Sequence, residues 1–391
     1  MSADREPRFL LRPITVVALV AAAGVAAMIW RFAAGLGAVT NLNDGYPWGI
    51  WIAYDDVIGT ALAGGGYAVA LLVFIANRGR YHPLVRPALL ASALGYTLAS
   101  LSVFVDIGRP WNAWRILLPW GWNARSPMLE VAICVVAYAG VLWLELAPAA
   151  IERWRDGGSP RAVRVAARSL PIFERALPWA IALGLLLATA QQSSLGALLL
   201  VARTKLHPLW HTPLLPLLFL GSTVGMGYAA VVVEHGIARL TVARRTDDAL
   251  LGSLTRLVPP ITFAWIALRF ADLGARGRLG MAFAGDRASV FLGLETALMA
   301  LPAIALSFEK VRARSDARFL AAIALLAAGA LYRFDAFLLF FNPGPGWSYF
   351  PSVPELVVTL GIVALDVLGY AVVVQRFPIL GGAPRLKEAS S

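Results

Sequence analysis

Long apolar segments recur along the chain and limit its fold more than any other feature. A helix needs about 17–25 mostly apolar residues to cross roughly 30 Å of hydrocarbon. The sequence contains ten such segments, at approximately 14–36, 49–76, 87–107, 127–147, 177–199, 213–238, 257–274, 289–309, 318–341 and 354–376. Its residues are 59% hydrophobic and only 15% charged, whereas soluble proteins have about 45–50% and 25%. We therefore predict an all-α polytopic membrane protein, which excludes the classes of water-soluble enzymes.

The basic residues indicate how the chain crosses the membrane. Most of the 34 Lys and Arg residues lie before the first helix, in the loops after even-numbered helices, and after the last helix. Cytoplasmic loops carry an excess of Lys and Arg, so we predict that both termini are cytoplasmic. The net charge of +11 is thus a topology signal, and no nucleic-acid partner is expected. The Arg-rich stretch 148–176 is predicted to be an interfacial helix.

Three short matches indicate an internal repeat. Gly66-Tyr67-Ala68 matches Gly227-Tyr228-Ala229, Asp106-Ile107-Gly108 matches Asp272-Leu273-Gly274, and Glu130 matches Glu295. The spacing between partners is nearly constant, and each half would begin on the same side of the membrane. This pattern predicts two parallel-repeat four-helix bundles, 49–199 and 213–341, flanked by helices 14–36 and 354–376, in one membrane domain spanning 1–391.

Ionisable residues inside a bilayer are energetically expensive and are functional candidates for that reason. In the first bundle these candidates are Asp55, Asp106 and Glu130, all in the outer half, while Glu234 lies near the cytoplasmic end of the sixth helix. The alternative is that such residues only neutralise one another. The pairs Arg269 with Asp272, and Arg333 with Asp335, are the ones this alternative predicts in the second bundle.

Aromatic residues gather at the outer ends of the first bundle, beside polar residues. They include Trp48 at the start of the second helix and Arg109 and Trp111 after the third. One interpretation is the interfacial aromatic belt common to membrane proteins. The other is the wall of a quinone site, since a quinone needs apolar walls and hydrogen-bonding groups at its carbonyl oxygens. Composition alone leaves both interpretations open.

The chain offers few ligands for a redox centre of its own. Cys134 is the single cysteine, whereas an iron–sulfur cluster typically needs four. The histidines are predicted to lie in loops or at a helix end, at His82, His207, His211 and His235. We therefore predict no haem, no iron–sulfur cluster and no bound metal in this chain, and expect electrons to arrive from another subunit.

Residues 46–114 resemble the NrfD/PsrC-like membrane subunits, in particular the HybB branch of hydrogenase-2-type nickel–iron hydrogenases. Further matches are SPMLEVAICVVAY, QSSLGALLL, KLHPLWHTPLLPLLFL and YFPSVPELVVTLG. The resemblance implies electron exchange between a quinone pool and an extracytoplasmic enzyme through a ferredoxin-like iron–sulfur subunit. It also implies a core of two four-helix bundles without haem, with the quinone site in the first bundle near the periplasmic face.

The resemblance and the residues above give a set of expected site residues. Glu130, Asp106, Tyr96 and Glu234 are expected to deliver protons or hydrogen bond to the quinone, which is menaquinone or ubiquinone. The quinone-binding residues are expected to be Trp48, Asp55, Arg109, Trp111, Gln191 and Gln192. Relatives commonly have a histidine where this chain has Gln191, and glutamine can hydrogen bond but cannot titrate.

Several functions fit these features, and the leading one is a quinone-reactive membrane subunit. Its expected partners are the iron–sulfur subunit and the large and small subunits of a [NiFe] hydrogenase. A molybdopterin enzyme of the polysulfide, sulfite or tetrathionate type is the alternative partner. A secondary transporter also fits ten helices with a repeat and buried carboxylates, although broken helices at the midplane are not obvious. A passive anchor would leave the buried acids unexplained.

Overall fold

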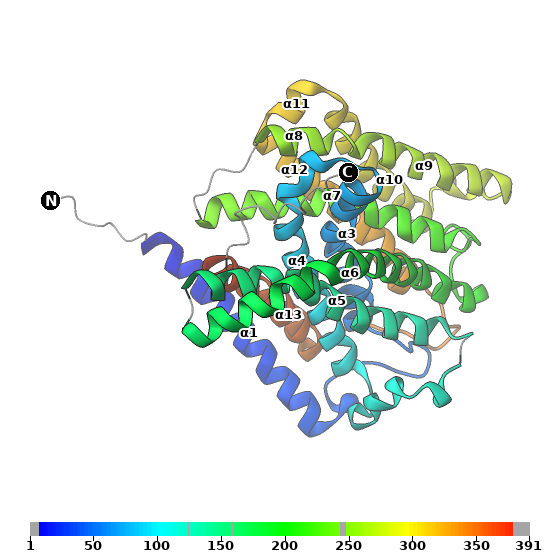
Figure 1. Ribbon diagram of the computed structural model, residues 1–391. Coiled ribbons are helices and arrows are strands. Elements are labelled where there is room, and N and C mark those ends of the chain that lie inside the picture. The colour runs from blue at the N-terminus through cyan, green and yellow to red at the C-terminus, as the bar shows by residue number, and fades with distance from the viewer. Residues whose placement is uncertain (1–7, 124, 158, 243–247, 378–391) are drawn as a thin grey trace.

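The protein is a bundle of membrane-length helices (Figure 1). The computed structural model describes residues 8–123, 125–157, 159–242 and 248–377, and these contain helices but no strands. Ten helical segments of the described chain are long and apolar enough to cross a membrane: Ile14–Ala34, Trp51–Ile75, Gly79–Asp106, Pro127–Arg153, Val163–Val201, Leu215–Ile237, Asp248–Ala275, Arg287–Ser307, Ser315–Leu339 and Val353–Arg376. Each overlaps one predicted segment, so the predicted all-α membrane fold is confirmed.

Seven long helices are uninterrupted, whereas three spans are broken. The long helices are α1 (Arg8–Ala34), α4 (Val85–Asp106), α5 (Pro127–Gly157), α6 (Pro160–Val201), α7 (Leu215–Val242), α10 (Arg287–Ser307) and α13 (Val353–Arg376). The span Trp51–Ile75, here called the second span, is assembled from α2 (Gly59–Leu62), α3 (Gly65–Ala70) and π-helical turns at either end. The other broken spans are α8 (Asp248–Thr255) followed by α9 (Val258–Ala275), and α12 (Ser315–Phe334) followed by a π-helical turn, Asp335–Leu339.

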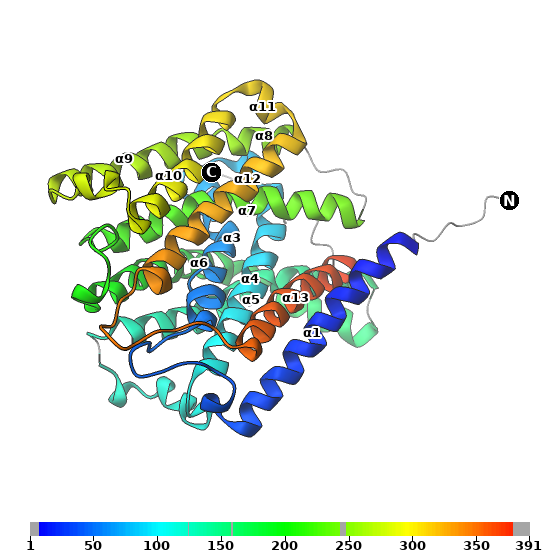
Figure 2. The same cartoon turned by 180° about the vertical axis from the view of Figure 1, so that it is seen from behind.

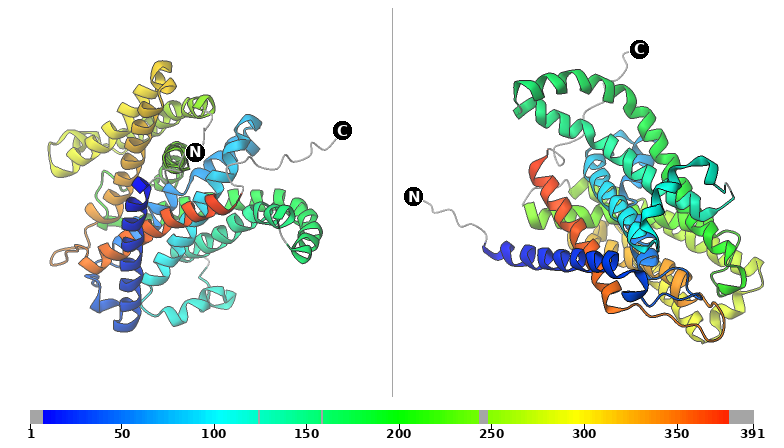
Figure 3. Two further views of the ribbon diagram at one scale, coloured as in Figure 1. Left: turned by 90° about the vertical axis from the view of Figure 1, so that its left-hand side faces the viewer. Right: turned by 90° about the horizontal axis from the view of Figure 1, so that it is seen from below.

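Alternating helix directions give the molecule two faces. The loops 35–50, 107–126, 202–214, 276–286 and 340–352 share one side, which we call the loop face. The start of α1, the end of α13 and the short helix α11 (Glu309–Ala313) share the other, which we call the terminal face. The predicted interfacial helix is not separate. Residues 148–176 instead extend α5 and α6 into a long hairpin that projects from the body (Figure 3).

The first and last spans pack directly on each other (Figure 2). Their backbones meet at Gly24 and Gly361, where a Cβ atom on either glycine would lie 2.4 Å from the Cα of the other. Only glycine permits that approach, and small residues at such contacts are typical of helix pairs in membranes. The flanking helices α1 and α13 therefore form one unit, which lies against α4 and the second span.

The remaining spans pack in two groups of four with the same order of neighbours. The N-terminal group consists of the second span, α4, α5 and α6, and the C-terminal group of α7, α8–α9, α10 and α12. In both groups each span contacts the next, and the fourth contacts the first. This packing agrees with the sequence repeat, while the division into two bundles as separate units remains a prediction.

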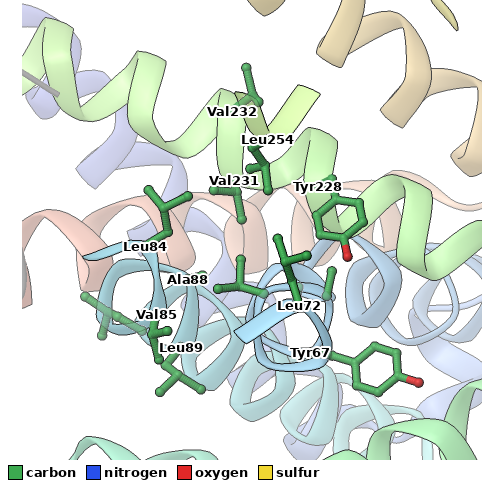
Figure 4. Packing of buried hydrophobic residues seen from close by; sticks show 14 of the residues in the cluster. Tyr67, Leu72, Leu84, Val85, Ala88, Leu89, Tyr228, Val231, Val232 and Leu254 are labelled. Carbon is green, nitrogen blue, oxygen red and sulfur yellow. The ribbon is translucent and has the colours of Figure 1, made fainter. Parts of the chain in front are cut away.

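The two groups share one hydrophobic core (Figure 4). Tyr67 and Leu72 of the second span pack with Tyr228 and Val231 of α7 and Leu254 of α8. The repeated Gly-Tyr-Ala motif lies at this junction, because a Cβ atom on Gly227 would be only 2.5 Å from the Gly64 carbonyl oxygen. The outer surfaces of the helices remain apolar, as lipid-facing surfaces should: exposed side chains there include Leu186, Leu301, Leu320 and Leu360.

Candidate functional site

A cluster of buried polar side chains lies where the two groups of helices meet. At its centre the Gln192 amide nitrogen donates to Gln191 Oε1 at 2.5 Å and lies 3.3 Å from the Tyr96 hydroxyl. The Tyr96 hydroxyl in turn donates to Gln191 Oε1 at 3.2 Å, and both amides reach Thr60 Oγ1. Three predicted site residues, Tyr96, Gln191 and Gln192, are thus brought together, and all three are fully buried.

Arg333 completes this central cluster from the C-terminal group. Its guanidinium donates to Gln192 Oε1 at 3.0 Å, to Thr223 Oγ1 at 2.7 Å and to the Val57 carbonyl at 3.0 Å. Asp56 faces the same guanidinium, and one oxygen of its buried carboxyl has no partner among the described residues. The central cluster therefore comprises Asp56, Thr60, Tyr96, Gln191, Gln192, Thr223 and Arg333, held by five spans.

Asp55 and Asp106 lie elsewhere, next to the flanking helices. The Asp55 carboxylate accepts hydrogen bonds from Ser102 of α4 at 3.2 Å and Thr359 of α13 at 3.1 Å. Asp106 faces Arg31 of α1, whose guanidinium donates to two carbonyl groups at the end of α4. Both acids keep one buried oxygen without a described partner. The predicted group of Asp55, Asp106 and Glu130 is thus not a single site.

The remaining residues predicted at the loop face differ in exposure. Trp48 is buried and donates from Nε1 to the Phe337 carbonyl at 2.9 Å, so it joins the second span to the end of the ninth. Trp111 is 70% exposed, and Arg109 and Glu130 are exposed too. No described contact joins Trp48 to Arg109 or Trp111. That these three residues line one quinone site remains a prediction, as does the role of Glu130.

Glu234 lies near the terminal face, as its place in the sequence predicts. Its carboxyl faces Asp366 and Tyr370 of α13, and its Oε2 has no partner within the described chain. No pattern in the sequence indicates that α13 lies beside Glu234. Its predicted role in proton transfer is not tested by this placement.

The predicted neutralising pairs of the C-terminal group are not formed. Arg269 pairs with Glu295 on α10 instead of Asp272. Asp272 pairs with Arg276, at 2.5 Å. Arg333 bonds within the central cluster, and no ion pair joins it to Asp335 in the described residues. Residues three or four apart share one face of a helix. Asp272 does pair in this way with Arg276, whereas Arg269 and Arg333 find their partners on other helices.

The loop face contains a further buried acid that sequence reasoning missed. Glu355, at the start of α13, forms a capping box with Ser352. It also accepts hydrogen bonds from the Tyr349 hydroxyl at 2.6 Å and from the backbone N–H of Asn41 at 2.9 Å. Ser352 followed by Glu355 is the sequence signature of such a cap. Glu355 therefore fastens the start of α13 to the loop after α1.

Comparison with known families identifies the chain. The family model described as "Polysulphide reductase, NrfD" matches residues 38–341. The chain belongs to the NrfD family. The match covers both groups of helices and the central cluster between them.

Curated relatives agree with this assignment. The NrfD-family chain is 39% identical, over 99% of its length and 97% of the relative, to the probable Ni/Fe-hydrogenase 2 b-type cytochrome subunit of Escherichia coli K12. It is also 28% identical, over 61% of its length and 57% of the relative, to the menaquinone reductase integral membrane subunit of Nitratidesulfovibrio vulgaris Hildenborough. The chain is therefore a multi-pass membrane subunit of a redox complex.

One prediction needs correction. The Escherichia coli relative is named a b-type cytochrome subunit, and b-type cytochromes contain haem. This name contradicts the predicted absence of haem, so that prediction is wrong.

The histidines of this NrfD-family chain do not form an evident haem site. His82 packs edge-on against Phe74, and the Nδ1 atom of buried His235 bonds to the Val231 carbonyl of its own helix. His207 and His211 lie on the loop face, where burial lowers the pKa of His207. No described contact joins two histidine rings from facing helices, as a bis-histidine haem requires. We assign no step to haem, and the described residues contain no group of three His, Cys, Asp or Glu side chains suited to a metal.

Proposed function

We propose that this protein is the quinone-reactive membrane subunit of a respiratory complex of the [NiFe] hydrogenase type. It would pass electrons from a partner iron–sulfur subunit to menaquinone or ubiquinone. The name and full-length similarity of the Escherichia coli relative support the type of complex. The name of the menaquinone reductase subunit supports quinone as the electron acceptor. A quinone takes up two electrons and two protons when it is reduced, so its site needs hydrogen-bond donors and a source of protons.

The central cluster is the observation that carries this proposal. The Tyr96 hydroxyl and the two glutamine amides are hydrogen-bond donors in otherwise apolar surroundings. Asp56 adds a carboxyl group with an unpartnered oxygen. Buried polar groups without a ligand role would be an unnecessary energetic cost inside a membrane. We propose that Tyr96, Gln191 and Gln192 bind the quinone head group and that Asp56 holds a proton for it.

The loop face is the proposed docking side for the partner subunits. Four exposed tryptophans lie there within one loop: Trp111, Trp114, Trp120 and Trp122. Aromatic side chains are enriched in protein interfaces. The distribution of basic residues supports a periplasmic loop face and cytoplasmic termini in the bacterial inner membrane.

A menaquinone reductase complex is the second candidate, favoured by the shorter match to its membrane subunit. It would differ in the partner subunits and not in the proposed quinone site. Purification of the chain with its native partners, followed by metal analysis, separates the two candidates. Nickel in the purified complex supports the hydrogenase type, and its absence from an active quinone-reducing complex overturns that assignment.

The proposed quinone site can be tested by comparing two electron acceptors in the purified complex. A soluble quinone analogue needs the membrane subunit, whereas a dye can take electrons directly from the partner subunits. We expect Tyr96→Phe and Gln192→Leu to slow quinone reduction about 10-fold or more, since a lost hydrogen bond costs about 1–3 kcal/mol. Dye reduction should stay within about two-fold of the unmodified complex, because the dye takes its electrons before they reach the membrane subunit.

Tyr228→Phe is the matched control, because Tyr228 is a buried tyrosine of the C-terminal group outside the central cluster. It should leave both activities unchanged. The proposal fails if Tyr96→Phe and Gln192→Leu behave like this control in an assembled complex.

A further inference from the structure

The C-terminal group contains buried polar atoms that the proposed quinone site does not use. Both carboxyl oxygens of Asp335, the hydroxyl of Tyr332 and one guanidinium nitrogen of Arg269 have no hydrogen-bond partner in the described chain. All three residues are at most 3% exposed. Unpaired buried polar atoms are rare, because each loses its bonds to water without replacement. Four of them lie close together, and those of Asp335 face a second carboxyl group, which cannot donate a hydrogen bond when it is ionised.

These atoms surround a second acid, Glu295 of α10. Glu295 contacts the Arg269 guanidinium through one oxygen and accepts a hydrogen bond from Trp210 Nε1 at 3.0 Å through the other. The Asp335 carboxyl faces Glu295, Arg269 and the exposed Arg287. The Tyr332 ring lies against Arg269, 4.8 Å from its guanidinium carbon. We call Arg269, Glu295, Tyr332 and Asp335 the acid–arginine cluster.

The charges of the acid–arginine cluster do not balance. Two carboxylates share one buried guanidinium, because the neighbouring Asp272 is paired with Arg276 and Arg333 is bonded within the central cluster. A charge buried without a partner costs several kcal/mol. Two neighbouring carboxylates avoid this cost by sharing one proton, since one O–H group then donates to the other carboxylate.

We propose that Glu295 and Asp335 together hold one exchangeable proton, which makes the acid–arginine cluster a proton-binding site. The proton comes from a hydronium ion, which becomes water, and forms an O–H bond with one carboxylate. When that bond breaks, the proton returns to water as hydronium. With the proton bound, the two acids and Arg269 are neutral overall. The site does not depend on the proposed quinone site.

A small cavity lies near this site. Its volume is about 30 Å³, and it is lined mainly by apolar side chains such as Met226, Ile261 and Met299, with Ser222, Thr262 and Trp265 on its wall. Trp265 also packs against Arg269 and Tyr332. Ser222 accepts a hydrogen bond from Arg333 at 3.2 Å. The cavity thus adjoins residues of both the acid–arginine cluster and the central cluster.

The backbone brings the site within reach of the loop face. Glu295 lies eight residues after the start of α10 at Arg287, which corresponds to about 12 Å at 1.5 Å per residue. Asp335 begins the π-helical turn Asp335–Leu339, and π-helical turns occur frequently at functional sites. Trp210, which binds Glu295, belongs to a loop of that face.

Infrared difference spectroscopy of the complex tests the proposal without quinone or electron donor. We expect the unmodified protein at neutral pH to show a protonated carboxyl band, shifted in D₂O, that is lost in both Asp335→Asn and Glu295→Gln. Other acids also absorb there, so the site is read from the difference between unmodified and variant spectra. Asp316→Asn is the matched control. Asp316 is an exposed acid at the start of α12, the helix that leads to Asp335, and it is paired with Arg314. It should keep the band.

Two results would overturn the proposal. One is identical carboxyl spectra for the unmodified protein, Asp335→Asn and Glu295→Gln, which would mean that both acids are ionised. The other is a band that disappears on adding sodium ions, which would make the cluster a cation site. If Asp335→Asn does not fold, Asp335→Glu keeps the carboxyl. Labelling its glutamates with ¹³C should then shift the band, and an unshifted band counts against the proposal.

Discussion

The two groups of helices carry acids at matching positions of the repeat but give them different partners. Asp272 of the C-terminal group forms an ion pair with Arg276. It also accepts a hydrogen bond from the Thr212 hydroxyl at 2.8 Å. Its counterpart Asp106 keeps one buried oxygen without a described partner and faces Arg31 of a flanking helix. Glu295 is buried against Arg269, whereas its counterpart Glu130 is exposed. A repeated acid therefore does not have repeated surroundings, because the cation beside it comes from its own span for Asp272 and from another helix for Asp106 and Glu295.

Substitution of Arg333 should cause the largest loss of stability, because its guanidinium hydrogen bonds to residues of both groups of helices. Arg333→Leu leaves Gln192, Thr223 and the Val57 carbonyl without their donor. We expect a loss of about 3–5 kcal/mol of stability, as when one partner of a buried charged network is removed. Thermal unfolding in detergent measures it, with Arg314→Ala as the control because Arg314 is exposed. Equal melting temperatures for Arg333→Leu and the control would show that the groups hold together without it.

The matched acids Asp272 and Asp106 should respond differently to loss of charge. Asp272→Asn weakens two hydrogen bonds to Arg276, and we expect it to lower stability by about 1.5–3 kcal/mol, the usual value of bonds between charged groups. Asp106→Asn removes the charge of a half-buried carboxyl that keeps one buried oxygen unpaired, so the melting temperature of this variant should stay equal or rise. Melting curves of the two variants, measured side by side, test the contrast. Equal destabilisation would contradict the proposed difference between the groups.

The glycines of the repeated motif, Gly66 and Gly227, should differ least in the stability lost on substitution by alanine. A Cβ atom on Gly227 would lie 2.5 Å from a backbone oxygen, that of Gly64. A Cβ atom on Gly66 would instead meet the side-chain oxygen of Ser92 at 2.6 Å and would stay 3.2 Å from the nearest backbone atom, the Ala88 carbonyl oxygen. We expect Gly227→Ala to cost about 1 kcal/mol or more through overpacking, and more than Gly66→Ala. Gly225→Ala is the control, since nothing lies within 4 Å of its added atom. The same melting measurements compare all three, and a larger loss for Gly66→Ala would reverse the expectation.

Much of the fold follows from the sequence because the bilayer imposes length and apolarity. All ten spans lie where apolar runs predict them, and the packing order of the groups agrees with the repeat. The expected separate interfacial helix was wrong, because residues 148–157 continue α5 and residues 160–176 belong to α6. The proline residues of this stretch, Pro148 and Pro171, lie inside α5 and α6 without ending either helix.

The site was harder to predict because its residues meet across helices. Tyr96, Gln191 and Gln192 are polar residues in apolar runs, which is a visible signal. That Arg333 would join them, and that Asp55 would face α13, depends on helix rotation. The π-helical turns at Asp55 and Asp56 and at Asp335 rotate these acids relative to an α-helix. No periodicity of the sequence reveals such a turn.

The close contact between Gly24 and Gly361 has a consequence for how the protein is made. Helix α1 is synthesised long before α13, so α1 is made without its packing partner. Until α13 arrives, the Asp55 carboxylate lacks Thr359 and the loop after α1 lacks Glu355. Completion of the loop face is therefore one of the last events of biogenesis, and a partner subunit that binds there would meet a finished surface only after α13 has inserted.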